Sequence, residues 1–145
     1  MKFTAVRLYL FILFFLSPSF AFAWSGKVVG VTDGDTIKVL HNSQQVKIRL
    51  YGIDTPEKKQ AFGQKAKQFT ANIVAGQVVE VEEVTFDRYG RTVGIVRLGS
   101  ACLNEELIQA GFTWVYTRYC DKPVCDRWKL FEQAARADRK GLWHG

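Results

Sequence analysis

The clearest structural signal lies in residues 48–57, which read Ile48-Arg49-Leu50-Tyr51-Gly52-Ile53-Asp54-Thr55-Pro56-Glu57. The first four residues alternate between the two faces of a strand, so Leu50 enters a core while Arg49 and Tyr51 point away from it. The glycine and the proline that follow favour a turn. We therefore predict a strand that ends at residue 51 and then bends sharply.

The bend brings Asp54 and Glu57 into the neighbourhood of Arg49. Carboxylates bind hard cations and a guanidinium binds anions, so this trio suits a site where a metal ion meets an anionic substrate. Taken alone, the same residues also fit a salt-bridged corner with only a structural role. Other motifs in the chain are needed to decide between a functional site and a structural corner.

The first 23 residues have the features of a secretory signal peptide. Lys2 and Arg7 precede an apolar run, residues 8–16, that is too short to span a bilayer. Ala21-Phe22-Ala23 is a small-x-small cleavage site. We expect cleavage after Ala23 and export to a periplasm or to the medium; an uncleaved membrane anchor is the alternative.

The predicted mature chain, residues 24–145, has the length of one domain with a core of its own. The net charge of the full sequence is +6, and it falls to +4 when Lys2 and Arg7 are removed. This excess fits an anionic partner, although many solvated surfaces carry as much. We expect a monomer with no membrane attachment after cleavage.

The mature chain contains three cysteines, Cys102, Cys120 and Cys125. In an oxidising compartment Cys120 and Cys125 can pair across the four residues between them, which would fix a bend before the last helix. Cys102 is then expected to be a buried free thiol. The sequence has no Cys-x-x-Cys motif to support a redox or zinc role.

Patterns of alternation and turn residues predict five strands, at residues 27–32, 36–40, 44–51, 77–86 and 92–98. The first helix is indicated by an apolar stripe at helical spacing from Phe62 to Ile73. Asn104 and Asp126 are predicted N-caps of the second and third helices. Glycines are expected to end the three helices, at Gly76, Gly111 and Gly141. The order β-β-β-α-β-β-α-α predicts an α+β, mainly β fold: a five-stranded OB-fold barrel with three helices.

Two more carboxylates lie in the turn Asp33-Gly34-Asp35 between the first two strands. Successive strands are neighbours, so Asp35 and Asp54 are expected at the same end of the barrel. There they could share one divalent cation, with the Thr55 carbonyl and waters as further ligands. A polar turn is the alternative, and an EF-hand is excluded because its twelfth position is Gln44.

A second outward cation follows the predicted hairpin turn Asp87-Arg88-Tyr89-Gly90-Arg91. Arg49 and Arg91 together could grip one phosphate from two sides with bidentate donors. An ordinary hairpin tip is the alternative for this motif on its own.

These residues resemble the staphylococcal nuclease, or thermonuclease, family. The resemblance extends over nearly the whole mature chain and rests on four motifs in the same order: Asp33-Gly34-Asp35-Thr36, Arg49 with Asp54-Thr55-Pro56-Glu57, Asp87-Arg88-Tyr89-Gly90-Arg91, and Asn104-Glu105 at the start of a helix that ends at Gly111. Each motif is weak by itself, but together on a matching strand and helix plan they are specific.

The resemblance implies a calcium-dependent phosphodiesterase that cuts DNA and RNA with little sequence preference and leaves 3′-phosphorylated products. Calcium (Ca²⁺) would be bound by Asp35, Asp54 and the Thr55 carbonyl. The partners would be single-stranded nucleic acid or frayed duplex, contacted through the phosphate backbone. No base readout is implied, because every contact named is to phosphate.

The resemblance also assigns roles to individual side chains. Glu57 would be the general base, and Arg49 and Arg91 would neutralise the phosphate in the transition state. Tyr89 would contact a substrate phosphate, and Tyr119 is the better candidate to stack on a nucleotide base. Ordinary packing is the alternative for the tyrosines.

The chain departs from the best-known member of the family in a shorter loop after Glu57 and in the pair Cys120 and Cys125. Two other classes of function remain open on sequence. One is a catalytically inactive OB-fold protein that only binds nucleic acid, which would be marked by loss of Glu57, Arg49 or Arg91. The other is an exported oligosaccharide-binding module, which would not need this charged set.

Overall fold

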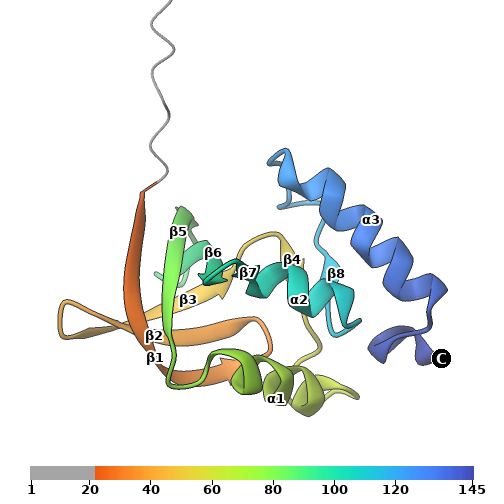
Figure 1. The fold of residues 1–145 in the computed structure, drawn as a ribbon, viewed down its shortest axis with the longest axis horizontal. Coiled ribbons are helices and arrows are strands. Elements are labelled where there is room, and N and C mark those ends of the chain that lie inside the picture. The colour runs from red at the N-terminus through yellow and green to blue at the C-terminus, as the bar shows by residue number, and fades with distance from the viewer. Residues whose placement is uncertain (1–21) are drawn as a thin grey trace, which may run out of the picture.

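A closed barrel forms the centre of the molecule in the computed structural model, which describes residues 22–145 (Figure 1). Its strands are β1 (Ala23–Asp33), β2 (Thr36–His41), β3 (Gln44–Leu50), β5 (Val78–Phe86) and β6 (Thr92–Leu98). They pair in the order β3-β2-β1-β5-β6, all antiparallel, and β6 returns to pair in parallel with β3. The predicted five-stranded OB-fold barrel is confirmed.

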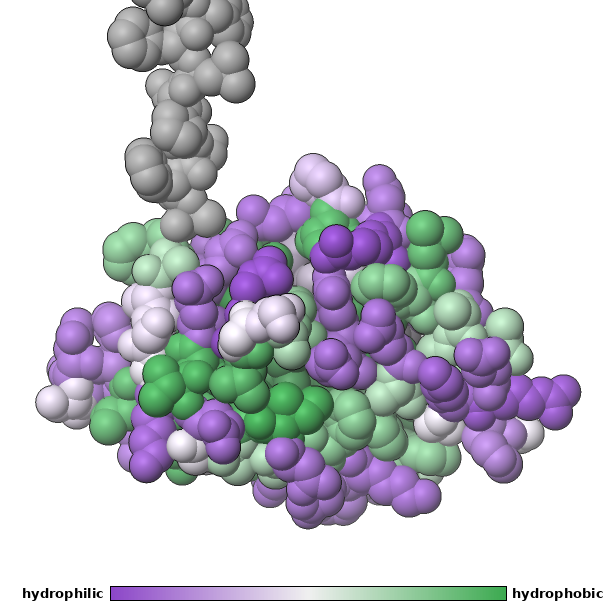
Figure 2. Space-filling view, in the orientation of Figure 1, coloured by the Kyte–Doolittle hydropathy of each residue, from purple (hydrophilic) through white to green (hydrophobic). Residues whose placement is uncertain are grey.

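Three helices accompany the barrel, as predicted. They are α1 (Gly63–Val74), α2 (Leu103–Gln109) and α3 (Val124–Ala137), and a 3-10 turn, η1 (Gly141–His144), follows the last. Helices α1 and α2 pack against the strands of the barrel, and α3 packs against α2 and the short strand β8 (Trp114–Val115). Figure 1 shows α1 running below the strands and α2 lying between the barrel and α3. Helix α3 buries Cys125, Trp128 and Ala135, while Figure 2 shows charged and polar residues over its outer side at the right of the view. Apolar residues gather instead over the barrel, at the lower left.

Three very short strands were not predicted, because two residues give no periodic signal. Strand β4 (Ile53–Asp54) pairs with β8 (Trp114–Val115), and β7 (Ala101–Cys102) extends the edge of β6. The first of these pairings matters most, since it fixes the backbone of Asp54 against the segment between α2 and α3.

The two predicted N-caps are wrong. Helix α2 begins at Leu103, and Asn104 lies inside it, fully buried. Its side chain accepts a hydrogen bond from the Val96 amide and donates one to the Tyr51 carbonyl, so it links the helix to the barrel instead of capping it. Helix α3 begins before Asp126, at Val124, directly after a proline whose ring suits the start of a helix.

Tyr51 was predicted to point outward with Arg49, and this is also wrong. The chain bends at residue 52, and α3 covers the side of the bend that a strand on its own would leave exposed. The Tyr51 side chain is only 3% exposed and its ring packs 6.1 Å from that of Trp128. Arg49 itself is half-buried, at 17% side-chain exposure.

Strand β1 begins earlier than predicted, at Ala23, and Trp24 is buried with its indole N–H donating to Glu83. Residues 1–21 of the predicted signal peptide lie outside the described residues. Within residues 22–145, no helix has the length and apolar character needed to cross a membrane.

Candidate functional site

Arg49 lies between two carboxylates at one end of the barrel. Its guanidinium is 3.0 Å from Asp35 Oδ2 and 2.9 Å from Asp54 Oδ1. The register of β2 and β3 pairs Arg49 with Thr36, next to Asp35, and the Leu50 amide donates to the Asp35 carbonyl. Strand pairing therefore brings together three residues that are up to 19 positions apart in sequence.

Asp35 holds this cluster to its surroundings. It is buried, and its Oδ2 accepts hydrogen bonds from the Thr55 amide at 3.0 Å and the Thr55 hydroxyl at 2.8 Å. Its Oδ1 accepts from the Thr36 hydroxyl. The turn itself is tied to α1, because the Thr70 hydroxyl donates to the Gly34 carbonyl. The base of the site is thus fixed by a network in which every buried polar group has a partner.

The cluster holds more negative than positive charge. Burial raises the pKa of Asp54 above its ordinary value, the Arg49 guanidinium opposes this, and the Asp35 carboxylate raises it further. Two carboxylates share one guanidinium, which leaves the cluster with a net negative charge. That negative charge would partly compensate the charge of a second cation bound beside the carboxylates. Asp54 is the more accessible of the two, with 36% of its side chain exposed.

The donors at this end of the barrel fit a hard cation. Two carboxylates and the Thr55 carbonyl are oxygen ligands of the kind that calcium prefers, and waters or substrate would have to complete its six to eight positions. Over the described part of the chain, no group of three or more His, Cys, Asp or Glu side chains is placed to hold a metal ion. A calcium ion here would therefore depend on Asp35, Asp54 and a backbone oxygen.

Glu57 stands in an exposed loop that is short and tightly closed. Its amide donates to the Gln60 side chain, and its carbonyl accepts from the Gln60 amide. A Cβ on Gly63 would lie 1.9 Å from the Glu57 carbonyl oxygen, so the first residue of α1 must be glycine for the loop to pass. The Glu57 carboxylate has no ion-pair partner within residues 22–145, which leaves it available to solvent.

Arg91 is held by its own turn. Asp87 accepts hydrogen bonds from the Tyr89 and Arg91 amides and, at 2.6 Å, from Arg91 Nε. The parallel pairing of β3 with β6 aligns Ile48 with Thr92, so Arg91 comes directly before the strand that neighbours the one carrying Arg49. Burial would raise the pKa of Asp87, but hydrogen bonds from Arg91 and Tyr89 lower it overall.

The two predicted substrate-contacting tyrosines are both exposed, in different places. Tyr89 is 69% exposed at the hairpin tip, with the Arg91 guanidinium 5.5 Å from its ring centre. Tyr119 lies beyond β8, edge-on to Tyr116 at 4.8 Å. The Tyr116 amide donates to the Gly52 carbonyl, which connects this aromatic pair to the segment that carries Asp54.

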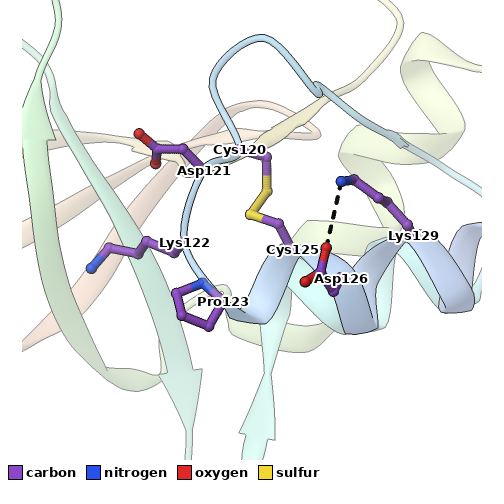
Figure 3. Close-up of a pocket in the computed structure, with 7 residues that line it drawn as sticks. All are labelled: Cys120, Asp121, Lys122, Pro123, Cys125, Asp126 and Lys129. Carbon is purple, nitrogen blue, oxygen red and sulfur yellow. Dashed lines mark ion pairs between the residues drawn. A yellow bond between two sulfur atoms is a disulfide. The ribbon is translucent and has the colours of Figure 1, made fainter.

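Cys120 and Cys125 form a disulfide, and Cys102 is a buried free cysteine. A shallow, open pocket of about 410 Å³ lies on the disulfide loop. Figure 3 shows the residues that line it: Cys120 to Pro123, Cys125, Asp126 and Lys129. Its charges are mixed, and none of its lining residues belongs to the Arg49 cluster. We therefore take the cluster and not the pocket as the candidate site.

Sequence reasoning missed three residues that shape the site: Tyr51, Gly63 and Asn104. The signal for Gly63 was present, since a glycine at the start of a helix is a poor helix former and needs a packing reason. No local signal marked the other two, because each is hydrogen-bonded to a residue more than 50 positions away in the chain: Asn104 to Tyr51, and Tyr51 to Asp121.

Comparison with known proteins agrees with the motifs. A family model described as "Staphylococcal nuclease homologue" matches residues 47–145. The micrococcal nuclease of Shigella flexneri is 41% identical, over 83% of this chain and 76% of its own. A protein of Escherichia coli named "uncharacterized endonuclease" is 39% identical, over 86% and 84%. A probable staphylococcal-like nuclease of Oryza sativa subsp. japonica is 36% identical over 70% of this chain and 30% of its own.

Proposed function

Because the chain belongs to the family of staphylococcal nuclease homologues, we propose that this nuclease is a calcium-dependent phosphodiesterase that hydrolyses DNA and RNA without sequence preference. The observation that supports it best is Arg49 of β3, held between two carboxylates, with Arg91 directly before the neighbouring strand β6. A site that must bind both a cation and a polyanion needs this juxtaposition of charges.

The chain's own residues supply most of the chemistry. Glu57, exposed and free of ion pairs among the described residues, accepts a proton from the attacking water. The new bond forms between the water oxygen and phosphorus, and the bond from phosphorus to the 5′ oxygen breaks. The 5′ oxygen then takes a proton from solvent water, which leaves one product with a free 5′-hydroxyl and the other with a 3′-phosphate.

Arg49 and Arg91 stabilise the negative charge that builds on the phosphoryl oxygens, through donors held in place before the substrate arrives. When bound by Asp35, Asp54 and the Thr55 carbonyl, calcium would polarise a phosphoryl oxygen and offset part of its charge. Tyr89 and Tyr119, both exposed, are the proposed contacts for the substrate phosphate and for a nucleotide base. All these contacts are to phosphate or to the face of a base, so they carry no sequence information.

We also propose that the protein is exported, cleaved after Ala23, and active as a monomer. The support is the pattern of residues 1–23 and the Cys120–Cys125 disulfide, which persists in oxidising compartments. Mass spectrometry of protein recovered from periplasm and medium tests this. A mature chain that begins at Trp24, with Cys120 linked to Cys125 in non-reduced peptides, is the expected result; a retained leader or free thiols at both positions contradict it.

The central test is release of acid-soluble nucleotides from single-stranded DNA by the purified mature chain, first with calcium and then with a chelator. We expect release only with calcium, and a loss of roughly 10²–10⁴-fold in the Glu57→Gln variant with DNA binding retained. Wild-type rates in that variant would remove Glu57 as the base. Binding of DNA without any release under calcium would favour the inactive binding protein instead.

A further inference from the structure

Tyr51 stands in the chain between the two groups that the site most needs to align, Arg49 and Asp54, and it is held from three sides. Its amide donates to the Gly94 carbonyl on β6 at 2.8 Å. Its carbonyl accepts from the Asn104 side chain on α2 at 3.0 Å. Backbone hydrogen bonds thus fix this residue to both the barrel and a helix.

The third attachment is through the hydroxyl, which lies inside the loop closed by the disulfide. It donates to Asp121 Oδ1 at 2.6 Å and accepts from the Asp121 and Lys122 amides at 2.9 and 3.1 Å. Burial, and then the hydrogen bond to Asp121, raise the pKa of Tyr51, so the hydroxyl keeps its proton and remains a donor. All the hydrogen-bonding capacity of the hydroxyl is used by a single loop of six residues.

The disulfide itself packs against Gly52, the residue that follows Tyr51. A Cβ on Gly52 would lie 2.6 Å from Cys120 Sγ and 3.1 Å from the Trp128 ring. The sulfur and the indole therefore pack directly on the backbone that leads to Asp54, in the positive-φ conformation that residue 52 adopts. Figure 3 shows the two cysteines joining the start of α3 to the end of the preceding segment, with Asp121 and Lys122 on the arc between them.

We propose that Tyr51 is a positioning residue of the nuclease site. The disulfide loop 120–125 acts through Tyr51 to hold the side chains of Arg49 and Asp54 in fixed positions relative to each other. This inference rests on the proposed function. Opening the disulfide frees the loop, the hydroxyl of Tyr51 loses its partners, and the bend at residue 52 loosens. The activity of the enzyme then depends on Cys120 and Cys125 staying oxidised as a disulfide, although neither is a reacting group.

Kinetics of three variants test the proposal: Tyr51→Phe, which keeps the ring and removes the hydroxyl, the double change Cys120→Ser with Cys125→Ser, and all three changes together. Displacement of reacting groups by about 1 Å can cost up to a hundredfold, so we expect kcat to fall roughly tenfold to a hundredfold with KM nearly unchanged. If hydroxyl and disulfide act as one unit, the combined variant is no worse than the more affected of the other two. Losses that multiply would overturn the coupling.

Amide hydrogen exchange in calcium-free protein gives a readout that does not depend on activity. The Thr55 amide donates to Asp35 Oδ2, so its protection reports whether the cluster is closed. We expect roughly tenfold faster exchange at Thr55 in Tyr51→Phe and in the double cysteine variant, with the Ile37 amide of β2 unchanged. Val79→Ala, a core truncation on β5, is the control for a general loss of stability and should not change exchange at Thr55 selectively.

The outcomes separate the two proposals. Wild-type protein without nuclease activity would refute the proposed function, and exchange at Thr55 would still decide whether Tyr51 holds the cluster. Active wild type with kcat and exchange in Tyr51→Phe no different from Val79→Ala would overturn the positioning role alone. If Tyr51→Phe fails to fold, mild reduction of the wild-type disulfide makes the same comparison.

Discussion

Two aspartates of this molecule each bind an arginine, yet their pKa values move in opposite directions. Asp54 shares Arg49 with a second carboxylate in a partly buried cluster, and burial raises its pKa above the ordinary value despite the guanidinium. Asp87 has Arg91 to itself and also accepts two backbone amides, which outweigh the effect of its burial and lower its pKa. The cluster of Asp54 also includes Asp35, which lies 14 positions before Arg49 in sequence, whereas Asp87 and Arg91 belong to one turn of five residues.

The difference separates a carboxylate that has a cation of its own from two carboxylates that share one. The hairpin tip satisfies the charge of Asp87 internally, so it gains little from an added cation. The barrel cluster keeps uncompensated negative charge in a half-buried place, which costs stability until a cation arrives. If both arginines act on one phosphate, as we propose, the site combines a group fixed by the whole barrel with one fixed by local structure.

The largest expected effects on this contrast come from replacing Arg49 or Arg91 by alanine. Both changes should lower kcat by roughly 10³–10⁵-fold, the range for arginines that stabilise a phosphoryl transition state. Only Arg49→Ala should also cost about 3 kcal/mol in the free energy of unfolding, because it leaves two carboxylates without their cation. Arg91→Ala should cost less than about 1 kcal/mol. Nucleotide release and urea unfolding measure the two quantities, and equal stability losses would erase the contrast.

The loop of Glu57 offers a smaller effect at a place between the two regions. Gly63→Ala forces a Cβ against the Glu57 carbonyl, so the loop has to shift and we expect kcat to fall roughly tenfold to a hundredfold. Gln64→Ala, one residue on and exposed, is the matched control and should leave kcat unchanged. Similar activity in both variants would mean that Glu57 needs no fixed position.

Stabilisation by calcium should distinguish Asp54 from Asp87 directly, because only Asp54 is a proposed ligand. At a concentration a hundredfold above its Kd, we expect calcium to stabilise the wild type by about 2–3 kcal/mol, and chelation to reverse this. Asp87→Asn should retain the stabilisation and Asp54→Asn should lose most of it, as measured by thermal unfolding with and without the ion. A full response in Asp54→Asn would move the metal site away from the barrel cluster.

The smallest expected effect is on the pH dependence of stability, to which Asp54 and Asp87 contribute with opposite signs. The folded-state pKa of Asp54 is raised, so its ionisation destabilises the fold as pH rises from 3.8 through the raised value. The folded-state pKa of Asp87 is lowered, so its contribution is present above 3.8 and is lost as pH falls through the lower value. In metal-free protein between pH 3 and 6, Asp54→Asn should therefore gain stability relative to wild type with rising pH, and Asp87→Asn should lose it. Parallel trends would contradict these assignments.

The barrel could be predicted from sequence because its strands are joined by short turns, and alternation with turn residues is a local signal. The neighbourhood of Asp35, Arg49 and Asp54 followed from the same reasoning, since adjacent strands place their ends together. The chemical roles of these residues stay predictions. What could not be foreseen depends on packing between distant segments: Tyr51 is buried because α3 covers it, and Asn104 lies inside a helix because its side chain links that helix to the barrel.

The parallel pairing of β3 with β6 has a consequence for the stage of folding at which the nuclease site is assembled. Ile48 and Thr92 lie 44 positions apart in sequence, so Arg49 and the segment of Arg91 come together only when this long-range contact has formed. A chain still emerging from synthesis, or threaded unfolded through a channel, has all the side chains of a nuclease and no assembled phosphate site.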